Sequence, residues 1–122
     1  MSYGYFRIIK AEFNVVDSRV RETLAENGFG VITEIDVKKT MKAKINEDFK
    51  PYTIIGACNP HIAHKALSDE PELGLLLPCN VIVEDLEDGT VRIGAIDAQK
   101  MLSITGRMDL KPLADEVNSL LV

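Results

Sequence analysis

Five short segments of this chain alternate apolar with polar side chains or are rich in β-branched residues, a pattern that predicts β-strands. These segments are residues 3–11, 29–37, 52–57, 80–85 and 90–96. The last two are separated by Glu87-Asp88-Gly89, and an Asp-Gly pair between two strands is typical of a β-hairpin. The chain therefore has to build a sheet with at least one antiparallel pair.

Helical periodicity occurs between these segments. Val16, Val20 and Leu24 recur every four residues and predict a helix over residues 15–27, which Gly28 would end in a left-handed conformation. Further helices are expected over residues 38–45, 59–68, 97–102 and 110–121. This order of elements predicts an α+β fold, in which helices cover one face of a mainly antiparallel sheet.

For two of the expected strands, the sequence also predicts which face of the sheet the apolar side chains point to. In the second, Phe29, Val31, Ile35 and Val37 are expected to point to one face, because residues two apart share a face. In the first, residues 5–9 place apolar side chains on both faces. A strand that is apolar on both sides has to be covered on both sides, whereas one layer of helices covers only one.

The length and the net charge of the chain limit its domain organisation and the functions that it can have. The 122 residues, 46 % of them hydrophobic, match one domain spanning residues 1–122. The net charge of −5 argues against a nucleic-acid partner, which requires clustered basic residues. No secretory signal and no apolar run of about 20 residues is found, so we expect no membrane segment, a cytoplasmic location and reduced cysteines.

Two cysteine-containing turns are the best candidate site: Cys58-Asn59-Pro60-His61 and Leu77-Pro78-Cys79-Asn80. Cys58 precedes a helix N-terminus, where free N–H groups favour an anion or a thiolate. Because both turns place a cysteine beside an asparagine and close to a proline, we predict that both thiols lie at one rim of the sheet. The alternative is that the asparagines and prolines only shape the turns, while the cysteines fill small apolar pockets.

A metal site is the less favoured interpretation of the same region. Its candidate ligands would be Cys58, His61, His64 and Cys79, which are residue types that zinc accepts. Their spacing is not one of the established zinc patterns, and the histidines fit equally well on the solvent side of a helix. No motif in the chain indicates a catalytic mechanism or a cofactor, so whether it is an enzyme stays open.

Several segments of the chain resemble one known family. They are Gly56-Ala57-Cys58-Asn59-Pro60, Ala63, Ala66-Leu67, the run from Gly74 to Val81 that contains Leu77-Pro78-Cys79-Asn80, the run Asn27-Gly28-Phe29-Gly30-Val31, and Glu34-Ile35-Asp36-Val37. Together they resemble the family called domain of unknown function 302, over about Val15 to Met101. The resemblance implies a small bacterial or archaeal α+β protein with a sheet like that of the TATA-binding protein, often a homodimer. It carries over no activity.

The resemblance also narrows the candidate site. It does not lead us to expect a histidine at the position of His61, which weakens a four-ligand metal site, and it leaves Cys58, Asn59, Cys79 and Asn80 as the residues that we expect to bind a ligand. Three functions stay open: a module that binds a small ligand or an anion at these turns, a thiol redox or metal-thiolate protein that uses Cys58 and Cys79, and a structural or interaction protein without a small-molecule site.

Overall fold

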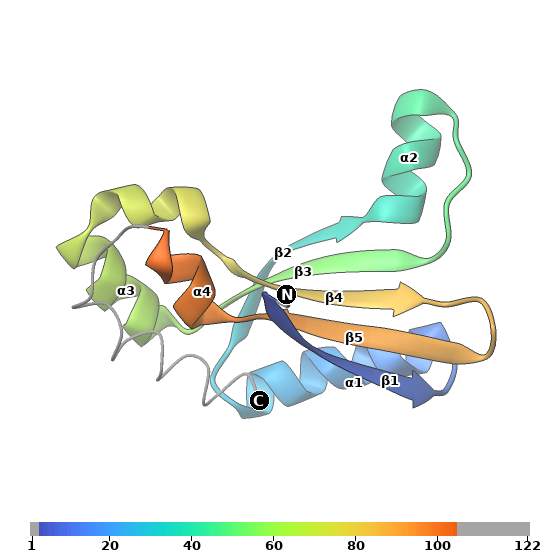
Figure 1. Ribbon diagram of the computed structural model, residues 1–122, viewed down its shortest axis with the longest axis horizontal. Coiled ribbons are helices and arrows are strands. Elements are labelled where there is room, and N and C mark those ends of the chain that lie inside the picture. Colours follow the sequence, from blue (N-terminus) through green and yellow to red (C-terminus); the bar gives the residue numbers. More distant parts are fainter. Residues whose placement is uncertain (1–2, 105–122) are drawn as a thin grey trace.

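The structure is a computed structural model that describes residues 3–104, and its strands form one five-stranded antiparallel sheet (Figure 1). The strands are β1 (Gly4–Lys10), β2 (Gly30–Asp36), β3 (Tyr52–Cys58), β4 (Cys79–Asp85) and β5 (Thr90–Ile96), and their order across the sheet is β1-β5-β4-β3-β2. The helices are α1 (Phe13–Glu26), α2 (Val37–Ile45), α3 (Pro60–Asp69), the 3-10 helix η1 (Pro71–Leu76) and α4 (Ala98–Ser103). The predicted α+β fold class is confirmed.

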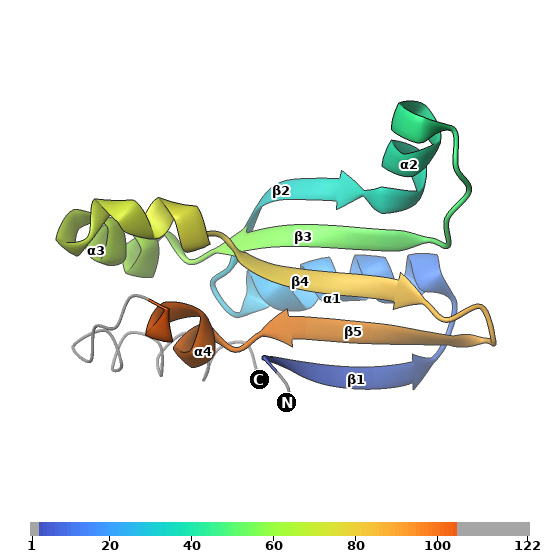
Figure 2. The same cartoon turned by 45° about the horizontal axis from the view of Figure 1, so that its top comes forward.

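The helices occupy three places around the sheet. The long helix α1 covers one face, while α3, η1 and α4 gather beyond one end of the strands (Figure 2). Figure 1 shows α2 on the opposite side of the sheet from α1, at the corner where β2 ends. None of the helices in residues 3–104 is long and apolar enough to cross a membrane.

The hydrophobic core lies between α1 and the central strands. Val16 of α1 packs in one cluster with Ile55, Val83 and Val91, which lie on β3, β4 and β5. Ile55 and Val83 have no exposed surface. The stripe that predicted α1 therefore does face the sheet, and β-branched side chains fill the pleated surface beneath it.

Local signals in the sequence end and begin these elements. Gly28, with φ +83°, ends α1 in a left-handed conformation, and Gly89, with φ +89°, closes the hairpin between β4 and β5. The carboxylate of Asp36 accepts a hydrogen bond from the backbone N–H of Lys39 at 3.0 Å and caps α2. Each of these positions was set by a residue type that favours its backbone conformation or cap.

The prediction for the second strand is wrong because β2 contains an irregularity. The register with β3 shifts between Val31 and Thr33, so that Ile32 is an extra residue. Val31 lies opposite Ala57, whereas Ile35 lies opposite Ile54. Ala57 and Ile54 point to different faces of β3, so Val31 and Ile35 also point to different faces.

Two further segments bear on the expectations from the sequence. Residues 73–77, where neither a strand nor a helix was predicted, belong mostly to η1, and Leu73 is only 1 % exposed. The helix expected over residues 110–121 lies outside the described residues.

The sheet face opposite α1, here called the open face, carries one buried charge. Glu84 is 4 % exposed. Its Oε2 lies 2.5 Å from Nζ of Lys50, and its Oε1 lies 2.6 Å from Nη2 of Arg92, which also donates through Nε at 2.8 Å. Burial raises the pKa of Glu84, but the hydrogen bonds and charges of Lys50 and Arg92 outweigh it, and the net pKa is lower than usual.

We expect Ile55→Ala to lower the free energy of unfolding by about 2–5 kcal/mol, because truncating a fully buried isoleucine removes apolar contact and leaves a cavity. Ile45→Ala is the matched control: its side chain on α2 is 62 % exposed, and we expect a change below about 1 kcal/mol. Urea unfolding of both variants measures this. Equal losses for the two would contradict the position of the core.

We expect Glu84→Gln to lower the free energy of unfolding at neutral pH by about 1–3 kcal/mol, because it removes the anion that two cations bind. A carboxyl group whose pKa is lowered by folding stabilises the folded state above its unfolded pKa, and this contribution is lost as the pH falls through the folded pKa. The difference between wild type and variant should therefore shrink below about pH 4–5. Unfolding curves at several pH values test this, and a difference independent of pH would contradict it.

Candidate functional site

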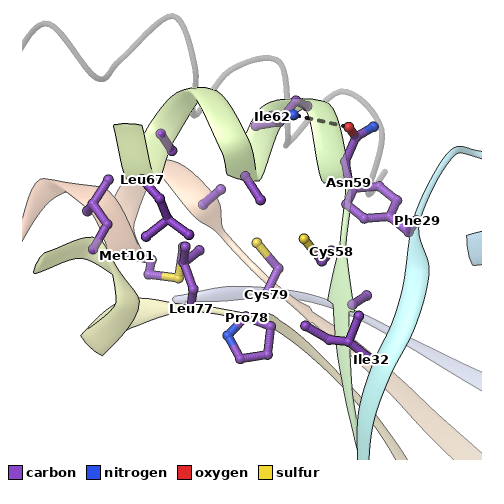
Figure 3. Close-up of a pocket in the computed structure, with 15 residues that line it drawn as sticks. Phe29, Ile32, Cys58, Asn59, Ile62, Leu67, Leu77, Pro78, Cys79 and Met101 are labelled. Atoms are coloured by element: carbon purple, nitrogen blue, oxygen red, sulfur yellow. Dashed lines mark hydrogen bonds between the residues drawn. The ribbon is translucent and has the colours of Figure 1, made fainter. Parts of the chain in front are cut away.

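A pocket of about 240 Å³ lies where the sheet meets the helices at its end, between α3, η1, α4 and the adjoining ends of β3 and β4 (Figure 3). Its walls are almost entirely apolar. They include Phe29, Ile62, Leu67, Leu73, Leu77 and Met101. Among the described residues that line it, none is Lys, Arg, His, Asp or Glu.

The register of the two central strands brings both cysteines to this pocket. Ala57 of β3 lies opposite Cys79 of β4, and this is the last pair before the strands separate. Cys58 follows Ala57 directly, so both thiols lie at the same end of the sheet. Both line the pocket, and Figure 3 shows their sulfur atoms directed into it.

Asn59 fixes the first turn of α3, which forms one wall of the pocket. Its side-chain oxygen accepts hydrogen bonds from the backbone N–H groups of His61 and Ile62, both at 3.2 Å, and Pro60 occupies the first helical position. Asparagine and proline are residue types that favour these two positions of a helix start. It also means that two of the N–H groups at this helix start, which could have bound an anion, already have a partner within the chain.

The two thiols are in an environment that disfavours the thiolate. Burial raises the pKa of Cys58. Burial also raises the pKa of Cys79, to about 11, and the nearby charge of an ionised Cys58 adds to this effect. A helix start alone would favour a thiolate at Cys58, but desolvation raises its pKa, which agrees with the alternative that the cysteines fill an apolar pocket.

The other candidate residues do not line the pocket with Cys58, Asn59 and Cys79. Asn80 lies opposite Gly56 on the open face, is exposed, and is not among the residues that line the pocket. His61 and His64 are exposed on α3 and do not line it either. Within residues 3–104, no group of three or more His, Cys, Asp and Glu side chains is placed to hold a metal ion.

Met101 and the wall residues Phe29, Leu73 and Leu77 were not identified from the sequence as part of the site. The apolar run at residues 73–77 was the available signal, since so many large side chains in a connection need a surface to pack against. With Met101, three sulfur-containing side chains line the pocket, the other two being Cys58 and Cys79.

We expect both thiols to react slowly with iodoacetamide near pH 7, at rates that rise as the pH increases past 9, because only the thiolate reacts and burial raises both pKa values. Cys58, which is partly exposed, should react before the buried Cys79. Mass spectrometry of timed samples measures each rate, with Cys58→Ser and Cys79→Ser identifying the sites. Rapid modification of Cys58 near pH 6 would contradict this environment.

Comparisons with known proteins agree with one another. The family described as "Domain of unknown function DUF302" matches residues 7–122. A crystal structure of an uncharacterized conserved DUF302 protein from Bacillus stearothermophilus superimposes with a TM-score of 0.89 and 26 % identity, covering 99 % of this chain and 94 % of that one.

A protein of Aquifex aeolicus (strain VF5), described as uncharacterized, is 35 % identical over 65 residues, which are 53 % of this chain and 44 % of that protein. The matched region thus spans less than half the length of this relative. The family match covers nearly the whole chain and the structural match nearly all of both chains, and the resemblance seen in the two cysteine turns is confirmed. The chain belongs to the DUF302 family.

Proposed function

We propose that this chain is a binding module for a small, uncharged, apolar molecule, which it holds in the pocket at the end of the sheet. The observation that carries the proposal is the pocket itself: about 240 Å³ lined by apolar side chains, with Cys58 and Cys79 among the lining residues. A cavity of about 150 Å³ with apolar walls is enough for benzene, so this one accommodates a larger molecule.

The lining favours a flat aromatic molecule over an aliphatic one. Three sulfur atoms, those of Cys58, Cys79 and Met101, belong to residues that line the pocket. Sulfur makes favourable contacts with aromatic rings, each of about 0.3–1.5 kcal/mol in the case of methionine. Such contacts need no ionised group, which suits thiols whose pKa is raised.

An anion is the other ligand class that the sequence left open, and the pocket offers it little. No described cationic side chain lines the pocket, and the N–H groups of His61 and Ile62 are bound to Asn59. An anion there would lose its hydration without gaining a counter-charge. For this reason we propose an uncharged ligand. Cys58, Asn59 and Cys79 are then the expected site residues that can contact it, and Asn80 is not.

A thiol redox or metal-thiolate function is the second candidate, because both cysteines of the chain line one pocket. The raised pKa values weigh against it, since both thiols are protonated near neutral pH. The modification rates predicted above separate the two functions. A fast-reacting Cys58 would favour thiol chemistry, whereas slow reaction at both sites favours a binding pocket.

We expect an uncharged naphthalene ketone, 6-propionyl-2-dimethylaminonaphthalene, to bind the wild-type protein and to shift its emission to shorter wavelength in the apolar pocket. Ala63→Leu adds bulk to a side chain that lines the pocket and should weaken binding at least tenfold. Ala43→Leu, a matched change on the exposed part of α2, should leave the affinity unchanged. Fluorescence titration measures all three.

Two competitors extend this experiment. Naphthalene should displace the probe more effectively than decalin, which has the same carbon skeleton but no aromatic ring, and inorganic phosphate should not displace it. No shift with wild type, or equal binding by both leucine variants, would contradict the proposal. Tight binding of phosphate would instead favour the anion alternative.

A further inference from the structure

The extra residue of β2, Ile32, is part of the candidate pocket. It lies where the register with β3 shifts, and it has no opposite residue on that strand. Of the seven residues of β2, Ile32 is the one that lines the pocket. Figure 3 shows its side chain on the same side of the pocket as Cys58. The irregularity of the strand and the wall of the pocket therefore meet at a single side chain.

The bulge explains how this side chain reaches the pocket. Side chains of a regular strand alternate between the two faces of the sheet, and an extra residue interrupts this alternation. Val31 lies opposite Ala57 on β3. Thr33 lies opposite the preceding residue of β3, Gly56, so Val31 and Thr33 point to different faces. The side chain between them is free of the alternation, and bulges beside binding sites commonly direct one side chain in this way.

The exposure of Ile32 places it at the mouth of the pocket. It is 59 % exposed although it lines the cavity. Ala57 and Leu73 also line the cavity, and each of them is only 1 % exposed. A residue that is mostly in solvent and still lines a cavity lies where the cavity opens, whereas the fully buried residues form its depth. Ile32 is therefore a side chain that an entering molecule has to pass.

Another residue of the pocket wall, Pro78, is held in place by close packing. A Cβ atom at position 56 of β3 would come within 2.6 Å of Cγ of Pro78, so the proline ring lies directly on the backbone of Gly56. The side chain of Thr33 contacts the same glycine from the side of β2. Because no space remains between these groups, Pro78 cannot move toward β3 to admit a molecule.

Ile32 is held less firmly than Pro78. β2 lies at the edge of the sheet and pairs with a strand on one side only. Within that pairing, the extra residue of a bulge does not take part in the regular ladder of hydrogen bonds. Its side chain is mostly in solvent and can therefore change its rotamer without displacing other groups. Of these two wall residues, Ile32 is the one that can move aside when a molecule enters.

We infer that Ile32 is a specificity-determining residue of the pocket, because its side chain narrows the mouth. A flat molecule presents a smaller cross-section than a thick one with the same number of carbon atoms, so it passes this side chain more easily. The inference deepens the proposed function, on which its meaning for ligand choice rests. The preference for flat aromatic molecules then has two sources, which are the mouth and the sulfur atoms inside.

Modification of Cys79 measures entry into the pocket without requiring that a ligand binds. Cys79 lines the pocket and is only 7 % exposed, so a reagent has to enter the pocket to reach its thiol. The experiment uses the Cys58→Ser protein, in which Cys79 is the one remaining thiol. N-phenylmaleimide and N-cyclohexylmaleimide are uncharged and differ in whether the ring is flat or thick. The ratio of their rates at one pH cancels the thiolate fraction, since both react with the thiolate.

We expect the Cys58→Ser protein to prefer the flat reagent by about fivefold or more, after division by the ratio that the same two reagents show with N-acetylcysteine. Adding Ile32→Ala widens the mouth and should abolish this preference, so that the ratio equals that of N-acetylcysteine. Adding Ile32→Phe instead fills the mouth and should slow both reagents about fivefold or more. Mass spectrometry of timed samples measures every rate.

Ile35→Ala is the matched control, because Ile35 lies on the same strand, is 47 % exposed and does not line the pocket. It should leave both rates unchanged. Loosening of the fold would speed modification in both Ile32 variants, so slower reaction of Ile32→Phe separates a blocked mouth from unfolding. No preference for the flat reagent, or an unchanged ratio in Ile32→Ala, would overturn the inference. If the preference is present but the naphthalene ketone does not bind, the proposed function alone is contradicted.

Discussion

The pairing of β3 with β4 is the constraint on which the rest of this structure depends. Its register sets Ile55 opposite Val81 on the face that α1 covers, and Ile54 opposite Ile82 on the open face. The same register ends at Ala57 and Cys79, where the strands separate around the pocket. A slip of this pairing by one residue would turn the side chains of one strand to the opposite face of the sheet. The two cysteines would then no longer lie on the same side of the rim. Core, pocket and open face are thus three results of one alignment.

Much of the architecture could be predicted because single residues or pairs of residues determine the local backbone conformation. The glycine at position 28, the Asn59-Pro60 helix start and the Asp88-Gly89 turn each favour one backbone conformation, and the structure has all three. The irregularity at Ile32 could not be predicted in this way, since an extra residue in a strand leaves the composition unchanged and shows only in the register.

At the candidate site, the local backbone could be predicted from the sequence, whereas the environment of the thiols could not. The sequence predicts a helix start beside Cys58 and the two cysteine turns at the same end of the sheet. It does not show that the capping residue, Asn59, occupies two of the helix N–H groups, nor that leucines of η1 and the connection to β4 remove water from the thiols. Desolvation then raises the pKa values that the helix start alone would lower. Asn80 does not line the pocket with its neighbour Cys79, because successive residues of a strand point to opposite faces.

The irregularity in β2 makes the two edges of the sheet unequal. A strand at an edge can act as a template for another strand only where its backbone is regular, and the extra residue at Ile32 interrupts β2 in its first half. Open-ended growth of a sheet, in which each molecule adds to the next, requires a regular strand at both edges. With β2 interrupted, strand-by-strand growth into fibrils lacks one of the two regular edges that it requires.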